Sequence, residues 1–113
     1  MCGISGIFSK VVLSDNDSKI GKKILNKLSH RGPDHSNYFI DEKKKIFLGH
    51  NRLAIICPNN EGNQPKIIEK FSIVFNGAIY NYKQLGFQFF DKGQNIKFSD
   101  TEILLKSWIK WKK

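Results

Sequence analysis

The first eight residues, MCGISGIF, constrain this chain most, because an apolar, strand-like run begins there directly behind a cysteine at position 2. A small second residue such as Cys2 favours removal of Met1, which leaves one residue with both a thiol and a free α-amine. The thiolate is the nucleophile, and an α-amine that titrates at about pH 7.7–8.0 suits a base that takes the thiol proton and later returns it. From the octapeptide alone two interpretations stay open: Cys2 is a nucleophile that carries its own base, or it is a small apolar residue of a first strand.

The length and composition restrict the class of protein. A chain of 113 residues with 40% apolar and 26% charged residues suits one soluble globular domain at most. No apolar run reaches the roughly 20 residues that span a bilayer, and the start of the chain lacks the order of a secretory signal. Two cysteines, Cys2 and Cys57, do not make a disulfide scaffold, so we expect a cytoplasmic protein. Neither cysteine has metal-ligand spacing, so we expect no metal site.

The formal net charge of +9 raises the hypothesis of a nucleic-acid-binding module. The 19 basic residues are 17 lysines and two arginines, and they are spread along the whole chain. Recognition of bases and phosphates by paired hydrogen bonds prefers arginine, whereas a diffuse excess of lysine is typical of a solvated surface. The charge pattern therefore disfavours a nucleic-acid partner.

Apolar residues recur at helical spacing in two long stretches. The first begins at Asp17, with Asp15 or Asp17 as its expected cap, and must end near residues 31–33 because a proline disfavours helical geometry in the residue before it. The second runs from Asp100 to about Trp111, and Ser99 and Glu102 in front of it have the spacing of a capping box. A shorter helical stretch is expected near 83–90. The apolar face predicted for the last helix consists of Ile103, Leu104, Trp108 and Trp111.

Short apolar runs between turn formers predict strands. Residues 37–40 and 46–50 read as a hairpin around a turn at 41–43, and 71–75 is the clearest single strand because it is rich in β-branched and aromatic residues. Residues 58–63 are dense in turn formers and predict a loop. The sequence therefore indicates helices together with strands.

Six short motifs follow one another along the chain. They are MCGISGIF, His30-Arg-Gly-Pro-Asp34, Gly49-His-Asn-Arg-Leu-Ala-Ile55, Gly62-Asn-Gln-Pro65, Phe75-Asn-Gly-Ala-Ile-Tyr-Asn81 and Ser99-Asp-Thr-Glu102. In this order and spacing they resemble the class II glutamine amidotransferase domain, an N-terminal-nucleophile hydrolase, and most closely the glutaminase half of glutamine-hydrolysing asparagine synthetases. The resemblance covers residues 1–113 and implies an α+β fold, the four-layer α/β/β/α sandwich with antiparallel sheets, here as an amino-terminal part that is truncated on its C-terminal side.

The resemblance also implies a site that hydrolyses L-glutamine to glutamate and ammonia through a thioester on Cys2. The side-chain amide of Asn76 and the backbone N–H of Gly77 would stabilise the oxyanion. Arg52 would bind the α-carboxylate of glutamine, and Asp100 its α-ammonium. From the residues alone, Arg52 could be a surface cation and Asp100 a first-turn residue favoured by the helix dipole. The implied pocket lining is Leu53, Ala54, Ile55, Ile56, Asn76, Gly77 and Ala78.

Other residues of the motifs have expected roles as well. His30, Arg31 and Asp34 would form a scaffold that shapes the site near the terminal amine, and His50 would be structural. Ala78 stands where such relatives usually have a glutamate, so one carboxylate of the implied pocket is missing.

The implied partner is an ATP-dependent synthetase domain or chain that receives the ammonia. No stretch resembles the S-G-G-L-D-S loop that binds ATP in such synthetases, so ATP and Mg²⁺ belong to that other part and no cofactor is expected here. The alternative function is a truncated, non-catalytic fragment or binding piece of such a domain.

Overall fold

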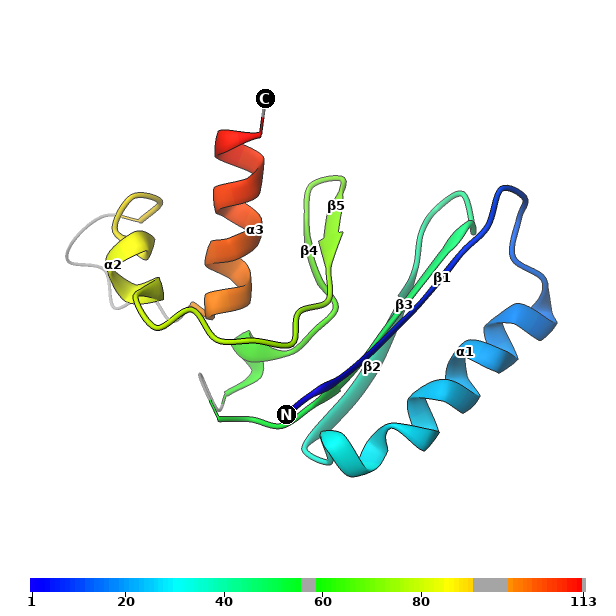
Figure 1. Ribbon diagram of the computed structural model, residues 1–113. Helices are drawn as coiled ribbons and strands as arrows, with labels where there is room; N and C mark the ends of the chain where they lie inside the picture. Colours follow the sequence, from blue (N-terminus) through cyan, green and yellow to red (C-terminus); the bar gives the residue numbers. More distant parts are fainter. Residues whose placement is uncertain (56–58, 91–97, 113) are drawn as a thin grey trace.

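The structure, a computed structural model, describes residues 1–55, 59–90 and 98–112 (Figure 1). These parts of the chain form a three-stranded and a two-stranded antiparallel sheet together with helices, so the predicted α+β class is confirmed. No helix among the described residues has the length and hydropathy to cross a bilayer.

The three-stranded sheet consists of β1 (Gly3–Phe8), β2 (His35–Ile40) and β3 (Ile46–Arg52) in the order β1-β3-β2. Its register pairs Gly3 with Asn51 and His35 with Arg52, so β1 and β2 begin where β3 ends. The structure confirms the predicted hairpin and extends both of its strands by two residues at the end away from the turn. As a result, Cys2, directly before β1, lies next to the end of β3.

Helix α1 (Asp15–Lys27) covers one face of this sheet (Figure 1). Leu13, Leu25 and Phe47 form a small buried core between them. The helix can approach closely because residue 21 is glycine, where a Cβ atom would lie 2.7 Å from the Phe47 ring. Since successive side chains of a strand point to opposite faces, residues 48, 50 and 52 of β3 face away from α1.

The predicted cap of α1 was wrong, because the N-cap is Ser14 rather than Asp15 or Asp17. Ser14 has extended backbone, and its hydroxyl accepts a hydrogen bond from the N–H of Asp17 at 3.1 Å. The Asp17 carboxylate accepts in return from the N–H of Ser14 at 2.8 Å. This reciprocal pair is a capping box, and the Ser14 hydrogen bonds lower the pKa of Asp17. The α-helix ends at Lys27, and a 3₁₀ turn over Ser29–Arg31 leads to the proline.

The second half of the chain contains a hairpin of β4 (Lys66–Ile68) and β5 (Phe71–Ile73), followed by α2 (Tyr82–Gly86) and α3 (Asp100–Trp111). The predicted strand 71–75 pairs only as far as Ile73, and its partner β4 was not predicted. Helix α2 is shorter than the stretch predicted near 83–90. Figure 1 shows the hairpin lying between α3 and the three-stranded sheet.

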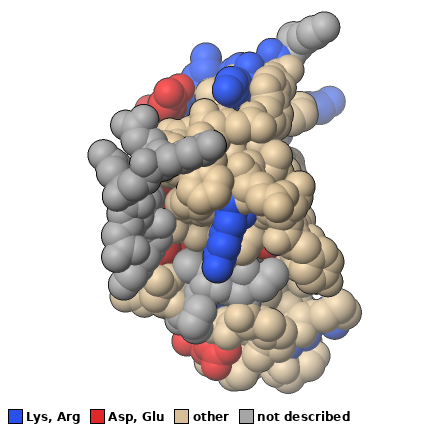
Figure 2. Space-filling model, turned by 90° about the vertical axis from the view of Figure 1, so that its left-hand side faces the viewer, with Lys and Arg blue, Asp and Glu red and all other residues tan. Residues whose placement is uncertain are grey.

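Helix α3 begins and ends where the sequence predicted, with the Ser99 hydroxyl accepting from the N–H of Glu102. Its predicted apolar face is only partly buried: Ile103 is buried and Leu104 is half-buried, whereas Trp108 and Trp111 are 62% and 50% exposed. The reason is that the hairpin strands, three residues each, cover only part of the helix. Leu105, which was not predicted to belong to this face, is buried. On the side of the molecule shown in Figure 2, Lys and Arg side chains lie in separate places between uncharged residues.

Candidate active site

A cavity of about 460 Å³ lies where the N-terminus, the end of β3, the loop before β4, the segment after β5 and the start of α3 meet. Five separate segments of the sequence therefore contribute to one site. The described residues that line it are Met1, Cys2, Arg52, Leu53, Ile55, Gly62, Gln64, Phe75, Asn76, Gly77, Ala78, Tyr80, Asp100 and Thr101.

Most of the site residues predicted from the sequence line this cavity. The two exceptions lie in the segment after β3. Ala54 is not part of the lining, because its backbone N–H donates to Oδ2 of Asp34 at 2.7 Å instead. Ile56 lies outside the described residues.

The thiol of Cys2 lies against the backbone of Leu53. The Leu53 N–H donates to Sγ at 3.3 Å, and Sγ is 3.7 Å from the Leu53 carbonyl oxygen, to which the S–H can donate. These contacts fix the half-buried sulfur at the wall of the cavity. The structure includes Met1, so the nitrogen of Cys2 is here a peptide nitrogen.

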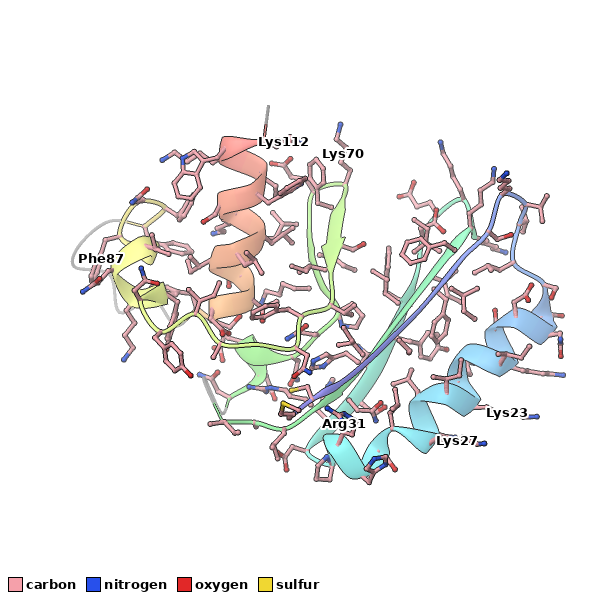
Figure 3. All side chains as sticks on the ribbon, viewed as in Figure 1. Lys23, Lys27, Arg31, Lys70, Phe87 and Lys112 are labelled. Atoms are coloured by element: carbon pink, nitrogen blue, oxygen red, sulfur yellow. The ribbon has the colours of Figure 1, made fainter. Side chains whose placement is uncertain are left out.

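The turn at residues 30–34 joins the start of β1 to the end of β3. Arg31 lies beside the start of β1 (Figure 3), where its Nε donates to the Cys2 carbonyl at 3.2 Å. Asp34 donates its N–H to the Arg52 carbonyl at 3.0 Å, in addition to accepting from Ala54. Gly32 allows the close approach, since a Cβ atom there would lie 2.3 Å from the backbone oxygen of Asn51. These contacts are those of a scaffold around Cys2.

His30 does not take part in that scaffold through its side chain. The ring is exposed, and Nδ1 lies 2.9 Å from the Lys27 carbonyl at the end of α1. A ring N–H directed at one of the last carbonyl groups of a helix is an ordinary C-terminal interaction.

Arg52 and Asp100 bring opposite charges to the cavity, and they are the charged side chains among its described lining residues. Arg52 is 5% exposed, so the interpretation as a surface cation is wrong. Its Nη1 donates to the Asn59 carbonyl at 2.7 Å and to Oδ1 of Asn63 at 2.8 Å, which holds the guanidinium in place. Asp100 is 6% exposed in the first turn of α3, and its Oδ2 accepts from the N–H of Ile79 at 3.2 Å.

Asn76 and Gly77 follow β5 and are exposed on the wall of the cavity that Cys2 also lines. A Cβ atom at residue 77 would lie 2.6 Å from the Phe75 ring, so any larger residue there would displace that ring. The Asn-Gly pair thus brings an amide side chain and an accessible backbone to the same cavity as a thiol.

Sequence reasoning missed the roles of Gln64 and Thr101, which are buried in the wall of the cavity. Both residues belong to the six motifs, but the motifs themselves indicate no function for either side chain. One signal in the sequence could have indicated the role of Gln64: its amide side chain precedes Pro65 in a loop rich in turn formers. If such an amide is buried, it must find hydrogen-bond partners.

His50 is completely buried on the face of β3 opposite α1. Within the described parts of the chain, neither ring nitrogen has a hydrogen-bond partner of good geometry. The pKa of His50 is lowered to about 4: burial is the main cause, the charges of Arg52 and His35 act in the same direction, and the Phe75 backbone acts in the opposite direction. The ring is therefore neutral at pH 7 and does not line the cavity, which fits the structural role expected for it.

We expect His50 to make the fold sensitive to acid. The folded-state pKa of about 4 is below the unfolded value of 6.5, so protonation of His50 favours the unfolded chain. The contribution of the neutral ring to the free energy of unfolding is therefore complete above pH 6.5 and is lost as the pH falls toward 4. Between pH 7 and pH 5 the wild type should lose about 2 kcal/mol of unfolding free energy through this group. Urea denaturation at both pH values measures it, with His50→Gln as the comparison. Equal losses in the two proteins would contradict the assignment.

No group of three or more His, Cys, Asp or Glu side chains that could hold a metal ion is found among the residues that the structure describes. The described lining of the cavity offers a thiol, side-chain amides, hydroxyl groups, backbone N–H groups and one pair of opposite charges.

Comparison with known proteins relates residues 1–113 to the family model of the glutamine amidotransferase domain. The chain is 38% identical to asparagine synthetase [glutamine-hydrolyzing] 1 of Bacillus subtilis, over 99% of this chain and 18% of that protein. It is also 38% identical to putative asparagine synthetase [glutamine-hydrolyzing] 2 of Methanocaldococcus jannaschii, over 97% of this chain and 24% of that protein. A third relative, asparagine synthetase [glutamine-hydrolyzing] 3 of Bacillus subtilis, is 33% identical over 98% of this chain. The chain thus spans about a fifth to a quarter of the length of these relatives.

Proposed function

Because this chain belongs to the glutamine amidotransferase domain family, we propose that its cavity hydrolyses L-glutamine to glutamate and ammonia, with Cys2 as the nucleophile. Relatives whose names state glutamine hydrolysis support this substrate. A cavity of about 460 Å³ is within the range of small-molecule sites, roughly 300–1,000 Å³, and is large enough for one amino acid.

The observation that carries the proposal is that a buried cation, a buried anion and a thiol share one cavity. Free glutamine is a zwitterion, so its α-carboxylate needs a cation and its α-ammonium an anion. Arg52 offers a planar guanidinium that can bind a carboxylate with two parallel hydrogen bonds, and Asp100 offers a carboxylate. With both ends of the amino acid held, its side-chain carboxamide is left to reach Cys2.

The reaction begins once Met1 has been removed, because only then is the nitrogen of Cys2 a free amine. That amine takes the thiol proton, and Sγ attacks the carboxamide carbon of glutamine. The carbon–nitrogen bond then breaks, and the amine returns the proton to the departing ammonia. Water hydrolyses the resulting thioester to glutamate and restores the thiol.

Each tetrahedral intermediate has a negatively charged oxygen that needs fixed donors. We assign the side-chain amide of Asn76 and the N–H of Gly77 to this role, since both residues line the cavity that Cys2 also lines. Removing one such donor typically costs about 2.7–4 kcal/mol of transition-state stabilisation. Ala78 adds no carboxylate, so the α-ammonium of glutamine depends on Asp100 among the described lining residues.

The ammonia would serve an ATP-dependent synthetase domain or chain, because the relatives are synthetases and this chain spans only 18–24% of their length. ATP and Mg²⁺ would then act in that partner, and the glutaminase cavity itself needs no cofactor. We also propose the four-layer α/β/β/α sandwich as the complete fold. It is supported by the sequence of layers in Figure 1, which runs from α1 through the two sheets to α3.

The direct test is to incubate the chain with L-glutamine after mass spectrometry has shown that Met1 is absent. We expect glutamate and ammonia in equal amounts. The matched control carries extra residues before Met1, so that the nitrogen of Cys2 stays in a peptide bond and the base is lost. Its rate should be lower by about 10²–10⁴-fold, the usual contribution of general acid–base catalysis. Equal rates in the two forms would exclude the terminal amine as the base.

A further inference from the structure

The side chain of Gln64 holds both backbone polar groups of Phe75. Its Oε1 accepts from the Phe75 N–H at 2.6 Å, and its Nε2 donates to the Phe75 carbonyl at 3.2 Å. The same Nε2 donates to Oγ1 of Thr101 at 3.0 Å. Gln64 and Thr101 are 6% and 2% exposed, so these hydrogen bonds are shielded from water.

The position of these contacts follows from the hairpin. The last backbone pair of β4 and β5 joins Lys66 to Ile73, and continuing that register would place Gln64 opposite Phe75. The backbone ladder ends before that pair, and the residue between, Pro65, has no N–H to donate. The amide side chain of Gln64 takes the place of the missing backbone partner, because a carboxamide has the same donor and acceptor as a peptide group.

Phe75 directly precedes Asn76 and Gly77, so Gln64 fixes one end of the segment that carries the proposed oxyanion donors. The other end is fixed by Asp100, whose Oδ2 accepts from the Ile79 N–H at 3.2 Å. Between these two points, residues 76–78 are exposed and line the cavity. A segment that is held at both ends and free in the middle can present donors in a fixed position.

We propose that Gln64 is a positioning residue that, by holding the backbone of Phe75, fixes the oxyanion donors of Asn76 and Gly77 in the cavity. This inference rests on the proposed glutaminase function. Donors stabilise a developing oxyanion only when they are aligned before the reaction, and a displacement of about 1 Å can cost about 100-fold in rate. Gln64 itself acts through Phe75, so its effect should fall on the chemical step rather than on the capture of glutamine.

The test compares Gln64→Met, which keeps the size of the side chain but forms none of the three hydrogen bonds, with Thr101→Val, which leaves both Phe75 contacts in place. We expect Gln64→Met to lower kcat by about 10–100-fold, with KM for glutamine changed less than about threefold. Thr101→Val should lower kcat by less than about fivefold. If Thr101→Val lowers kcat as much as Gln64→Met does, the proposal is contradicted. The loss would then come from the hydrogen bond between Gln64 and Thr101 of α3, and not from the hydrogen bonds between Gln64 and Phe75.

Two further measurements separate positioning from general damage. Alkylation of the Cys2 thiol by iodoacetamide forms no oxyanion, so Gln64→Met should react at the wild-type rate. Amide hydrogen exchange at the Phe75 N–H should become at least about tenfold faster in Gln64→Met, since its acceptor is lost. If Gln64→Met does not fold, Gln64→Glu keeps the acceptor but neither donor, and it should lower kcat by about 3–10-fold.

The outcomes distinguish this inference from the proposed function. A wild-type chain that releases no ammonia overturns the glutaminase proposal itself. An active wild type whose Gln64→Met variant keeps full kcat overturns only the role of Gln64. A variant that loses kcat, affinity for glutamine and thiol reactivity together also overturns it, because that pattern indicates a purely structural residue.

Discussion

Replacing Cys2 with alanine should abolish glutamine hydrolysis, with kcat lower by about 10⁴-fold or more. Loss of a catalytic nucleophile in an enzyme that forms an acyl intermediate costs about 10⁶-fold, and the detection limit of an ammonia assay sets the lower figure. The expectation follows from the position of Sγ, which contacts the Leu53 backbone in the wall of the cavity that Arg52 and Asp100 also line. Coupled detection of glutamate and ammonia under single-turnover and steady-state conditions measures the loss.

The matched control is Cys57→Ala, because Cys57 is the other cysteine of the sequence. It should keep the wild-type rate, and iodoacetamide should inactivate it as fast as the wild type. A Cys2→Ala protein that still releases ammonia at more than about a hundredth of the wild-type rate would contradict the thioester mechanism.

Replacing Arg52 with lysine should lower kcat/KM for glutamine by about 10²–10³-fold. Lysine keeps the positive charge but has no planar pair of donors for a carboxylate, and breaking a buried charge pair costs about 3–5 kcal/mol. The Arg52 side chain is 5% exposed and is held by Asn59 and Asn63, so a lysine would also leave these two acceptors poorly satisfied. Most of the loss should be in KM, since the α-carboxylate is bound equally in substrate and transition state.

Glutaminamide lacks the α-carboxylate, so it shows whether the lower kcat/KM of Arg52→Lys comes from weaker binding of that group. The wild type should prefer glutamine over glutaminamide by about 10²-fold or more, and Arg52→Lys should nearly abolish that preference. Thermal unfolding of both proteins serves as the control for folding. A change below about threefold in kcat/KM, or an unchanged preference, would exclude Arg52 as the carboxylate-binding residue.

Local patterns predicted the elements that depend mainly on neighbouring residues. The turn at 41–43 and the strands on either side of it, and the capping residue Ser99 in front of α3, were correctly located because their signals lie within a few residues. The cap of α1 was misassigned although its signal is local as well. Ser14 and Asp17 satisfy each other reciprocally, so the acidic residue is the partner of the cap and not the cap itself.

The sequence by itself determined six motifs, and their resemblance to a family implied which residues a glutaminase site would use: Cys2 behind Met1, Arg52, the Asn76-Gly77 pair and Asp100 at the start of a helix. Only the tertiary structure decided that Cys2, Arg52, Asn76 and Asp100 line one cavity. It also decided that Gln64 holds Phe75, the residue directly before Asn76. The structure likewise decided that His50 is buried while Trp108 and Trp111 are largely exposed. The physical reason is that residue types and their spacing specify local hydrogen bonds and turns, whereas burial and convergence depend on how far each sheet and helix extends over its neighbours.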